Sequence, residues 1–133
     1  MSKRMTKGEL QESMGAFNPV GHAVLAFGDD KAAGEAAQAL REAGFGADDL
    51  LVFTSGELFP DLQDMMRNAS GAAGFGYEIT LMRRYMTLAS EGVGWVVVYA
   101  PDEAQVVKAK GVASRLGARS AVSYGRLVHE DLI

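Results

Sequence analysis

One pattern of residues occurs twice in this chain, at a constant separation of 73 positions. In each copy, a short apolar run is followed by an aspartate, a stretch with one apolar face, a glycine and a second apolar run. A continuous apolar run indicates a buried strand, and an apolar face with helical periodicity indicates a helix. The pairs that keep this separation are Gly21 and Gly94, Asp29 and Asp102, and Gly44 and Gly117. The chain is therefore predicted to contain two strand–helix–strand units.

The first copy has strands at 22–27 and 50–53, joined by a helix from Ala32 to Ala43. The second copy has strands at 94–100 and 121–124, and its helix begins at Pro101-Asp102-Glu103. The inner faces of the two helices are apolar, with Ala33, Ala36, Leu40 and Ala43 in the first and Val106, Ala109, Ala113 and Leu116 in the second. Leu40 and Leu116 are expected to be buried against the sheet at matching places.

Two such units in one sheet give the plan of the ferredoxin-like fold, an α+β double βαβ architecture. In that fold the first and third strands are central, and the second and fourth lie at the edges. The strands at 22–27 and 94–100 are apolar on both faces, as central strands should be. The strand at 121–124 carries Ser123 and is followed by Gly-Arg, which suits an edge. The alternative is an α/β flavodoxin-like parallel sheet, with the middle segment as its crossover.

A segment of 40 residues, from Thr54 to Val93, separates the two units and is too long for a hairpin loop. We predict a helical insert at about 55–92. Its first helix begins near Pro60, and its second runs from about Tyr77 to Ser90 after a glycine-rich break. The apolar arc of the second helix covers half of its circumference, so it should be buried against more than one neighbour. The insert or a second subunit must cover the sheet face that the two unit helices leave open.

The domain organisation follows from these elements. Residues 1–18 show no sustained periodicity and are predicted to form a mobile N-terminal arm, and residues 19–133 to form a single α/β domain. The basic amino terminus is not followed by the apolar run of a secretory signal. No apolar stretch approaches the ~20 residues that span a bilayer. The chain is expected to be cytoplasmic, without a membrane partner.

Composition narrows the range of chemistry. The net charge is −4, which gives no general attraction to nucleic acid, so a nucleic-acid partner is not expected. Cysteine is absent, which excludes disulfides, thiolate metal sites and cysteine nucleophiles. The two histidines, His22 and His129, have no metal-ligand spacing to acidic residues, and we expect neither a metal nor a cofactor. No Gly-x-Ser-x-Gly elbow is present to support a hydrolase.

The closing stretch carries a family resemblance. From Ala118 to Leu132, a strand ending in Tyr124-Gly125-Arg126 is followed by Glu130-Asp131 and a leucine. This stretch, and the opening half with its aspartate and alanine-rich helix, resemble small bacterial proteins grouped with general stress proteins. The middle of the chain departs from that pattern. The resemblance implies a stress-associated protein of unknown activity and supplies no catalytic residues.

Glu78 is the main candidate site residue, because it lies at the centre of the apolar arc of the second insert helix. A buried carboxylate needs a partner and is often functional. The alternative is that Glu78 lies in the first helical turn for local reasons, since the helix dipole favours acids there. Arg84 lies on the polar face of the same helix and is a candidate anion or carboxylate clamp, with a solvated face as the ordinary alternative. Tyr77 and His22 complete the set of candidate ligand-binding residues.

These features favour a non-enzymatic ligand-sensing or interaction module, expected to be a homodimer that buries parts of residues 58–90. The alternative is a small enzyme or small-molecule-binding protein with a pocket between the sheet and the helical insert. The catalytic residues of such an enzyme are unknown from the sequence.

Overall fold

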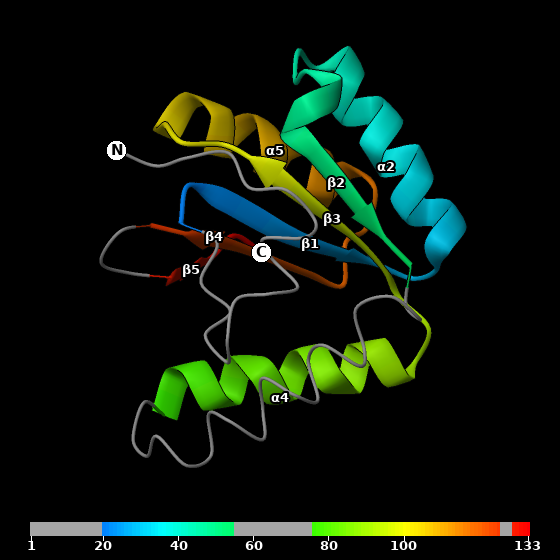
Figure 1. Ribbon diagram of the computed structural model, residues 1–133, viewed down its shortest axis with the longest axis vertical. Coiled ribbons are helices and arrows are strands. Elements are labelled where there is room, and N and C mark those ends of the chain that lie inside the picture. Colours follow the sequence, from blue (N-terminus) through cyan, green and yellow to red (C-terminus); the bar gives the residue numbers. More distant parts are fainter. Residues whose placement is uncertain (1–19, 55–75, 126–128) are drawn as a thin grey trace.

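In the computed structural model of the chain, residues 20–54, 76–125 and 129–133 are described. They form five strands, three α-helices and one 3-10 helix, coloured along the chain in Figure 1. In chain order the elements are β1 (His22–Phe27), α2 (Asp30–Glu42), η1 (Ala47–Asp49), β2 (Leu50–Phe53), α4 (Gly76–Ser90), β3 (Gly94–Tyr99), α5 (Glu103–Arg115), β4 (Ser120–Tyr124) and β5 (His129–Asp131). The architecture is α+β.

The five strands form one antiparallel sheet with the order β2-β3-β1-β4-β5. Strands β1 and β3 lie inside the sheet, as predicted. The parallel-sheet alternative is wrong, because β1 runs antiparallel to both β3 and β4. The prediction that β4 is an edge strand is also wrong, since β5 pairs along its outer side. Strand β5 has three residues, two of them acidic, and is too short and too polar to give a strand pattern.

The duplication is visible in the helices. The bounds of α2 and α5 are separated by the same 73 positions as the sequence landmarks. The Asp29 carboxylate accepts a hydrogen bond from the N–H of Ala32 at 2.7 Å, and the Asp102 carboxylate accepts one from the N–H of Gln105 at 2.9 Å. These are side-chain N-caps at equivalent positions. Gly44 follows α2 with φ 114°, a left-handed conformation that favours glycine.

Two apolar layers lie on the two faces of the sheet. Helices α2 and α5 cover one face, and α4 covers the other (Figure 1). We call these the α2/α5 face and the α4 face. The α2/α5 face includes Ala23, Leu25, Phe27, Val96, Val98 and Ala121, packed against Ala33, Ala36, Leu40, Ala109, Val112 and Ala113. The α4 face includes Val24, Ala26, Phe53, Trp95, Val97, Val122 and Tyr124, packed against Tyr85, Leu88 and Ala89.

The predicted equivalence of Leu40 and Leu116 is wrong. Leu40 is fully buried in the cluster on the α2/α5 face, but Leu116 is 40% exposed. Leu116 is the C-cap residue of α5, so it lies at the end of the helix rather than over the sheet. At the constant separation, the residue that matches Leu40 is Ala113, which is buried.

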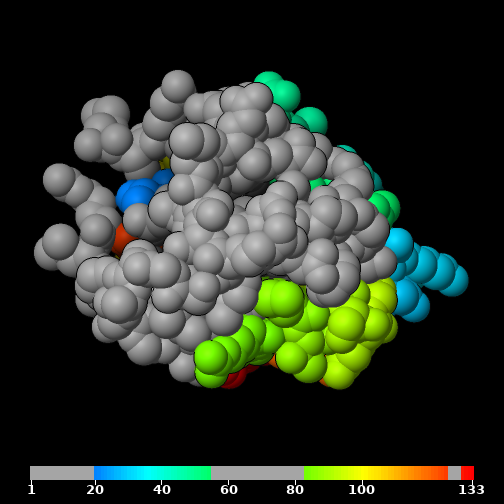
Figure 2. All heavy atoms as spheres, turned by 60° about the horizontal axis from the view of Figure 1, so that its bottom comes forward, coloured from blue at the N-terminus to red at the C-terminus, as the bar shows by residue number. Residues whose placement is uncertain are grey.

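The second helix of the insert is confirmed as α4, and it covers the face that α2 and α5 leave open. Figure 2 turns this side of the molecule forward and shows the C-terminal part of α4 at the surface. The predicted arm at 1–18, the first insert helix near Pro60 and the glycine-rich break lie outside the described residues. Within the described parts of the chain, no helix is both long and apolar enough to cross a membrane.

Candidate functional site

His22 belongs to the packed α4 face of the sheet. Its side chain is 2% exposed, and its ring centroid lies 5.0 Å from that of Tyr99 on the neighbouring strand. The Nδ1 atom lies 3.1 Å from the carbonyl oxygen of Val20. Because a carbonyl can only accept, Nδ1 carries the proton and donates this bond. The arrangement fixes the orientation of the ring.

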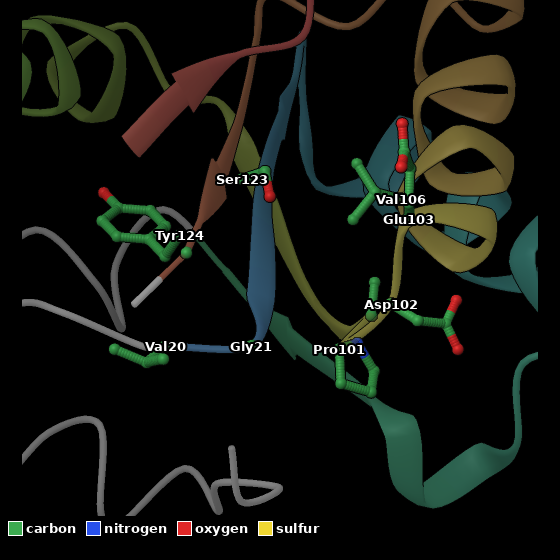
Figure 3. A pocket seen from close by; sticks show the side chains of 10 residues that line it. Val20, Gly21, Pro101, Asp102, Glu103, Val106, Ser123 and Tyr124 are labelled. Carbon is green, nitrogen blue, oxygen red and sulfur yellow. The ribbon is translucent and has the colours of Figure 1, made fainter. Parts of the chain in front are cut away.

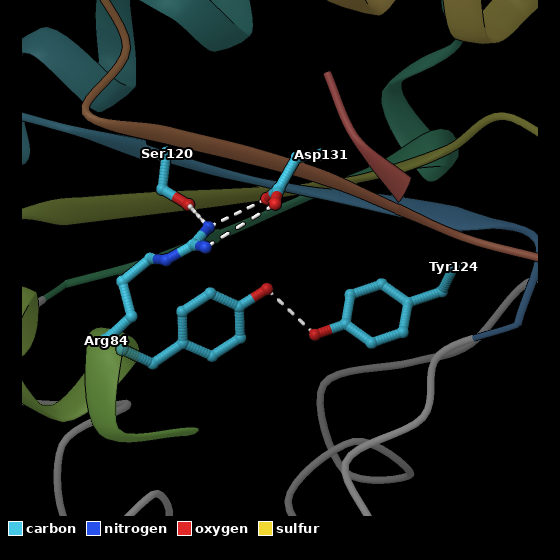
Figure 4. A network of polar contacts seen from close by, with 5 residues as sticks. Arg84, Ser120, Tyr124 and Asp131 are labelled. Atoms are coloured by element: carbon cyan, nitrogen blue, oxygen red, sulfur yellow. Dashed lines mark hydrogen bonds and ion pairs between the residues drawn. The ribbon is translucent and has the colours of Figure 1, made fainter. Parts of the chain in front are cut away.

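Arg84 ties α4 to the C-terminal strand (Figure 4). Its Nη1 donates to Asp131 Oδ1 at 2.8 Å and to Ser120 Oγ at 3.5 Å, and Nη2 lies 3.5 Å from Asp131 Oδ2. The side chains of Arg84 and Asp131 are 36% and 41% exposed. The guanidinium therefore forms an ion pair with a carboxylate of the same chain, and binding of a ligand at Arg84 stays a prediction.

Of the four predicted site residues, His22 and Arg84 have described side chains, and these two lie apart. Ser120, which contacts Arg84, pairs with Ala26, whereas His22 lies four residues earlier on the same strand. At ~3.3 Å per residue, these positions are about 13 Å apart along β1. Tyr77 and Glu78 lie in the first turn of α4, but their side chains fall outside the described set. The hypothesis that Glu78 is buried thus stays a prediction.

A pocket of about 500 Å³ opens at the end of the sheet, where α5 begins. It lies between the start of β1, the end of β4 and the first turn of α5 (Figure 3). Its lining is Val20, Gly21, Ala100, Pro101, Asp102, Glu103, Val106, Ser123, Tyr124 and Gly125. We call it the α5 pocket. Neither His22 nor Arg84 is among its described lining residues.

The same corner of the first half is filled with side chains. The counterpart of Ala100, 73 positions earlier, is Phe27, whose ring is 1% exposed in the cluster on the α2/α5 face. Ser123 also has a larger counterpart, which follows from the strand pairing. Ser123 pairs with Ala23 in the second half of the sheet. The residue that matches Ala23 is Val96, and Val96 pairs with Val52. An aromatic ring and a branched side chain in the first half are thus replaced by a methyl group and a hydroxyl. This loss of volume accounts for the hollow.

The start of α2 is also packed more tightly than the start of α5. In the first half, Gly94 touches the start of α2 so closely that a Cβ atom there would lie 2.7 Å from the Ala33 Cβ and 2.7 Å from the Asp29 carbonyl oxygen. The residues that match Gly94 and Ala33 are Gly21 and Val106, and both line the pocket. Valine has two methyl groups more than alanine and could not be accommodated in such a tight approach. The second corner therefore stays open.

The polar lining of the α5 pocket is acidic. Asp102 and Glu103 contribute carboxylates, and the ten lining residues that the structure describes include no lysine, arginine or histidine. The Asp102 carboxylate accepts the capping hydrogen bond from Gln105. Among the described residues, no side chain or backbone group pairs with the exposed Glu103 carboxylate. These residues also include no group of three or more histidine, aspartate or glutamate side chains suited to a metal ion.

Sequence reasoning missed this pocket because its defining residues are small or look purely structural. The sequence pattern assigns Asp102 and Glu103 only to a helix start, and Ser123 only to an edge strand. A residue-by-residue comparison of the two halves would have shown Phe27 opposite Ala100. That contrast is visible in the sequence, but only the strand pairing places Ser123 beside it.

Comparisons with known proteins give no relative. No protein-family model matches the chain, and no curated protein and no solved structure matches it.

Proposed function

We propose that the chain is a non-enzymatic small-molecule-binding module whose ligand occupies the α5 pocket. The observation that carries the proposal is the hollow corner: equivalent positions in two copies of one unit are filled in the first half and open in the second. Its size falls in the range of about 300–1,000 Å³ that is usual for small-molecule sites. The lining combines apolar walls with a few polar groups, as such sites do.

The chemistry of the pocket supports binding rather than catalysis. In the described part of the lining, Ser123 supplies an aliphatic hydroxyl, and no histidine or lysine is present there to activate it. The side chain of His22 lies on the α4 face, whereas Ser123 has the strand position of the α2/α5 face. A sensing or interaction role is consistent with such a site, and the resemblance to general stress proteins is our reason for proposing a stress-associated context.

The scaffold that we propose for the module is a ferredoxin-like core extended by β5. The strand order of the two repeated units, β2-β3-β1-β4 with all pairs antiparallel, supports this assignment. We also propose a homodimer that buries parts of residues 58–90. The exposed positions Arg83, Thr87 and Ser90 near the end of α4 are polar, so an apolar interface would have to use other residues of that range. Light scattering at high micromolar concentration measures the assembly state, and a monomer would refute the dimer.

The binding proposal is tested by filling the pocket. Ala100→Phe places in the second half the residue that the first half carries at the equivalent position. A fragment library is screened by thermal shift and by ¹H–¹⁵N NMR against the wild type and this variant, with Leu116→Ala as an exposed control. We expect fragments that stabilise the wild type and the control but not Ala100→Phe. A ligand at 100 times its Kd stabilises by about 2.7 kcal/mol, which is readily measured. Fragments that bind Ala100→Phe as well as the wild type, or no binding at all, would refute the proposal.

A further inference from the structure

The charge of the α5 pocket selects among ligand classes. Among the described lining residues, the two side chains with a formal charge are acids, Asp102 and Glu103. They lie in and next to the first turn of α5, whose backbone N–H groups would otherwise attract an anion. The capping bond from Gln105 to Asp102 uses one of those donors, and the two carboxylates repel a further negative charge. An anionic ligand is therefore disfavoured.

The two carboxylates have different roles. Asp102 is held by the N-cap hydrogen bond at 2.9 Å and serves the helix. Glu103 is exposed at the pocket and has no partner among the described residues. Figure 3 shows Glu103 and Val106 on the α5 side of the pocket and Ser123 on the β4 side. Glu103 is thus the group available as a counter-ion, with the Ser123 hydroxyl as a second polar group across the pocket.

The remaining lining is apolar. Val20, Pro101 and Val106 contribute hydrocarbon side chains to the lining, and Ala100 stands at the position where the first half carries Phe27. A ligand that complements the pocket combines a compact apolar body with a positive group at one end. We infer that the α5 pocket binds a small organic amine, with its ammonium group at Glu103 and its alkyl or aryl part in the corner filled by Phe27 in the other half. This inference rests on the proposed function and names its ligand class.

The test uses three probes of nearly equal shape: phenethylamine, 2-phenylethanol and 3-phenylpropionate. Each is titrated by ¹H–¹⁵N NMR into the wild type, Glu103→Gln and Ala100→Phe, with Glu35→Gln on the exposed side of α2 as the matched charge control. We expect the amine to bind the wild type and to shift the amide signals of Gly21, Glu103 and Ser123. Glu103→Gln should weaken the amine by roughly tenfold, as expected when a hydrogen bond to a charged group is lost. Glu35→Gln should leave its affinity unchanged.

Added salt should also weaken the amine, because the charges at this exposed rim are screened. The amine assignment would be overturned if the alcohol or the acid bound the wild type as tightly as the amine. If that binding were lost in Ala100→Phe, the pocket would still stand as a binding site. An amine whose affinity is unchanged in Glu103→Gln would overturn the role of Glu103. Binding of every probe to Ala100→Phe at wild-type affinity would overturn the site itself. Failure of the amine to bind the wild type overturns the inference, while the fragment screen decides the proposed function separately.

Discussion

Gly94 lies against the start of α2, where the structure has no room for a side chain. A Cβ atom there would lie 2.7 Å from a backbone oxygen and from the Ala33 Cβ, distances that real Cβ atoms do not show. We expect Gly94→Ala to lower the free energy of unfolding by about 1–3 kcal/mol, because overpacking forces the helix and strand apart. Gly34→Ala is the matched control: it lies within α2 with open space around its Cα, and should stabilise the protein by about 0.5–1 kcal/mol. Urea denaturation measures both, and equal effects of the two substitutions would contradict the close approach.

Leu40 and Leu116 differ in burial, and we expect their truncation to differ in its effect on stability. Leu40→Ala should destabilise by about 2–5 kcal/mol, as truncations of fully buried leucines do. Leu116→Ala should cost less than about 1 kcal/mol, because this side chain is 40% exposed at the end of α5. The helical periodicity alone places both on an inner face, and it cannot show that α5 ends at Arg115. A large loss for Leu116→Ala in chemical denaturation would mean that a partner covers it.

At the scale of elements, α4 is fixed to the sheet by polar and aromatic contacts. The hydroxyls of Tyr85 and Tyr124 lie 2.8 Å apart in a buried position, and the Tyr85 ring packs edge-on against Trp95 at 5.2 Å. We expect Tyr85→Phe to lower the free energy of unfolding by about 1–3 kcal/mol, since it removes the hydrogen bond between two buried hydroxyls. In a double-mutant cycle with Tyr124→Phe, the two substitutions should be non-additive by at least 0.5 kcal/mol or so. Strict additivity would show that the hydroxyls act independently.

The elements differ in how far the sequence could predict them. Helices α2 and α5 were predictable because each combines an aspartate N-cap, one apolar face and a terminal glycine. Strand β5 was not, since three residues carry no period and its pairing with β4 is a long-range contact. The ion pair between Arg84 and Asp131 could not be predicted either, because the two residues are 47 positions apart in the sequence. Local patterns specify elements, and only the assembled sheet shows which side chains meet.

At the scale of the whole molecule, the repeated unit in the sequence predicts most of the scaffold. The α5 pocket arises where the two copies of the unit differ in side-chain size. The constant separation of 73 positions predicted the two matching helices α2 and α5, and the apolar runs predicted central positions for β1 and β3. The α5 pocket could not be predicted in the same way, since its lining residues Ala100 and Ser123 lack the distinctive chemistry of residues such as Glu78 and Arg84. A pocket that forms because side chains are small has no characteristic sequence motif. It emerges when Phe27 and Ala100 are compared in their shared structural setting.

That comparison predicts the effect of making the two halves alike. Ala100→Phe should raise the free energy of unfolding of the ligand-free protein by about 0.5–2 kcal/mol, because it fills a hollow with apolar surface. Ser123→Val, which copies Val52 of the first half, fills less volume and should have a smaller effect of the same sign, since it also removes a hydroxyl from a half-buried position. Both are measured by urea denaturation, with NMR spectra to verify the fold. Binding and stability should then change in opposite directions: the filled variants gain stability and lose ligand-induced stabilisation, as expected when a pocket is kept open for function. A loss above about 1 kcal/mol in Ala100→Phe, typical of an overpacked core, would show that the corner cannot hold the ring that its counterpart holds.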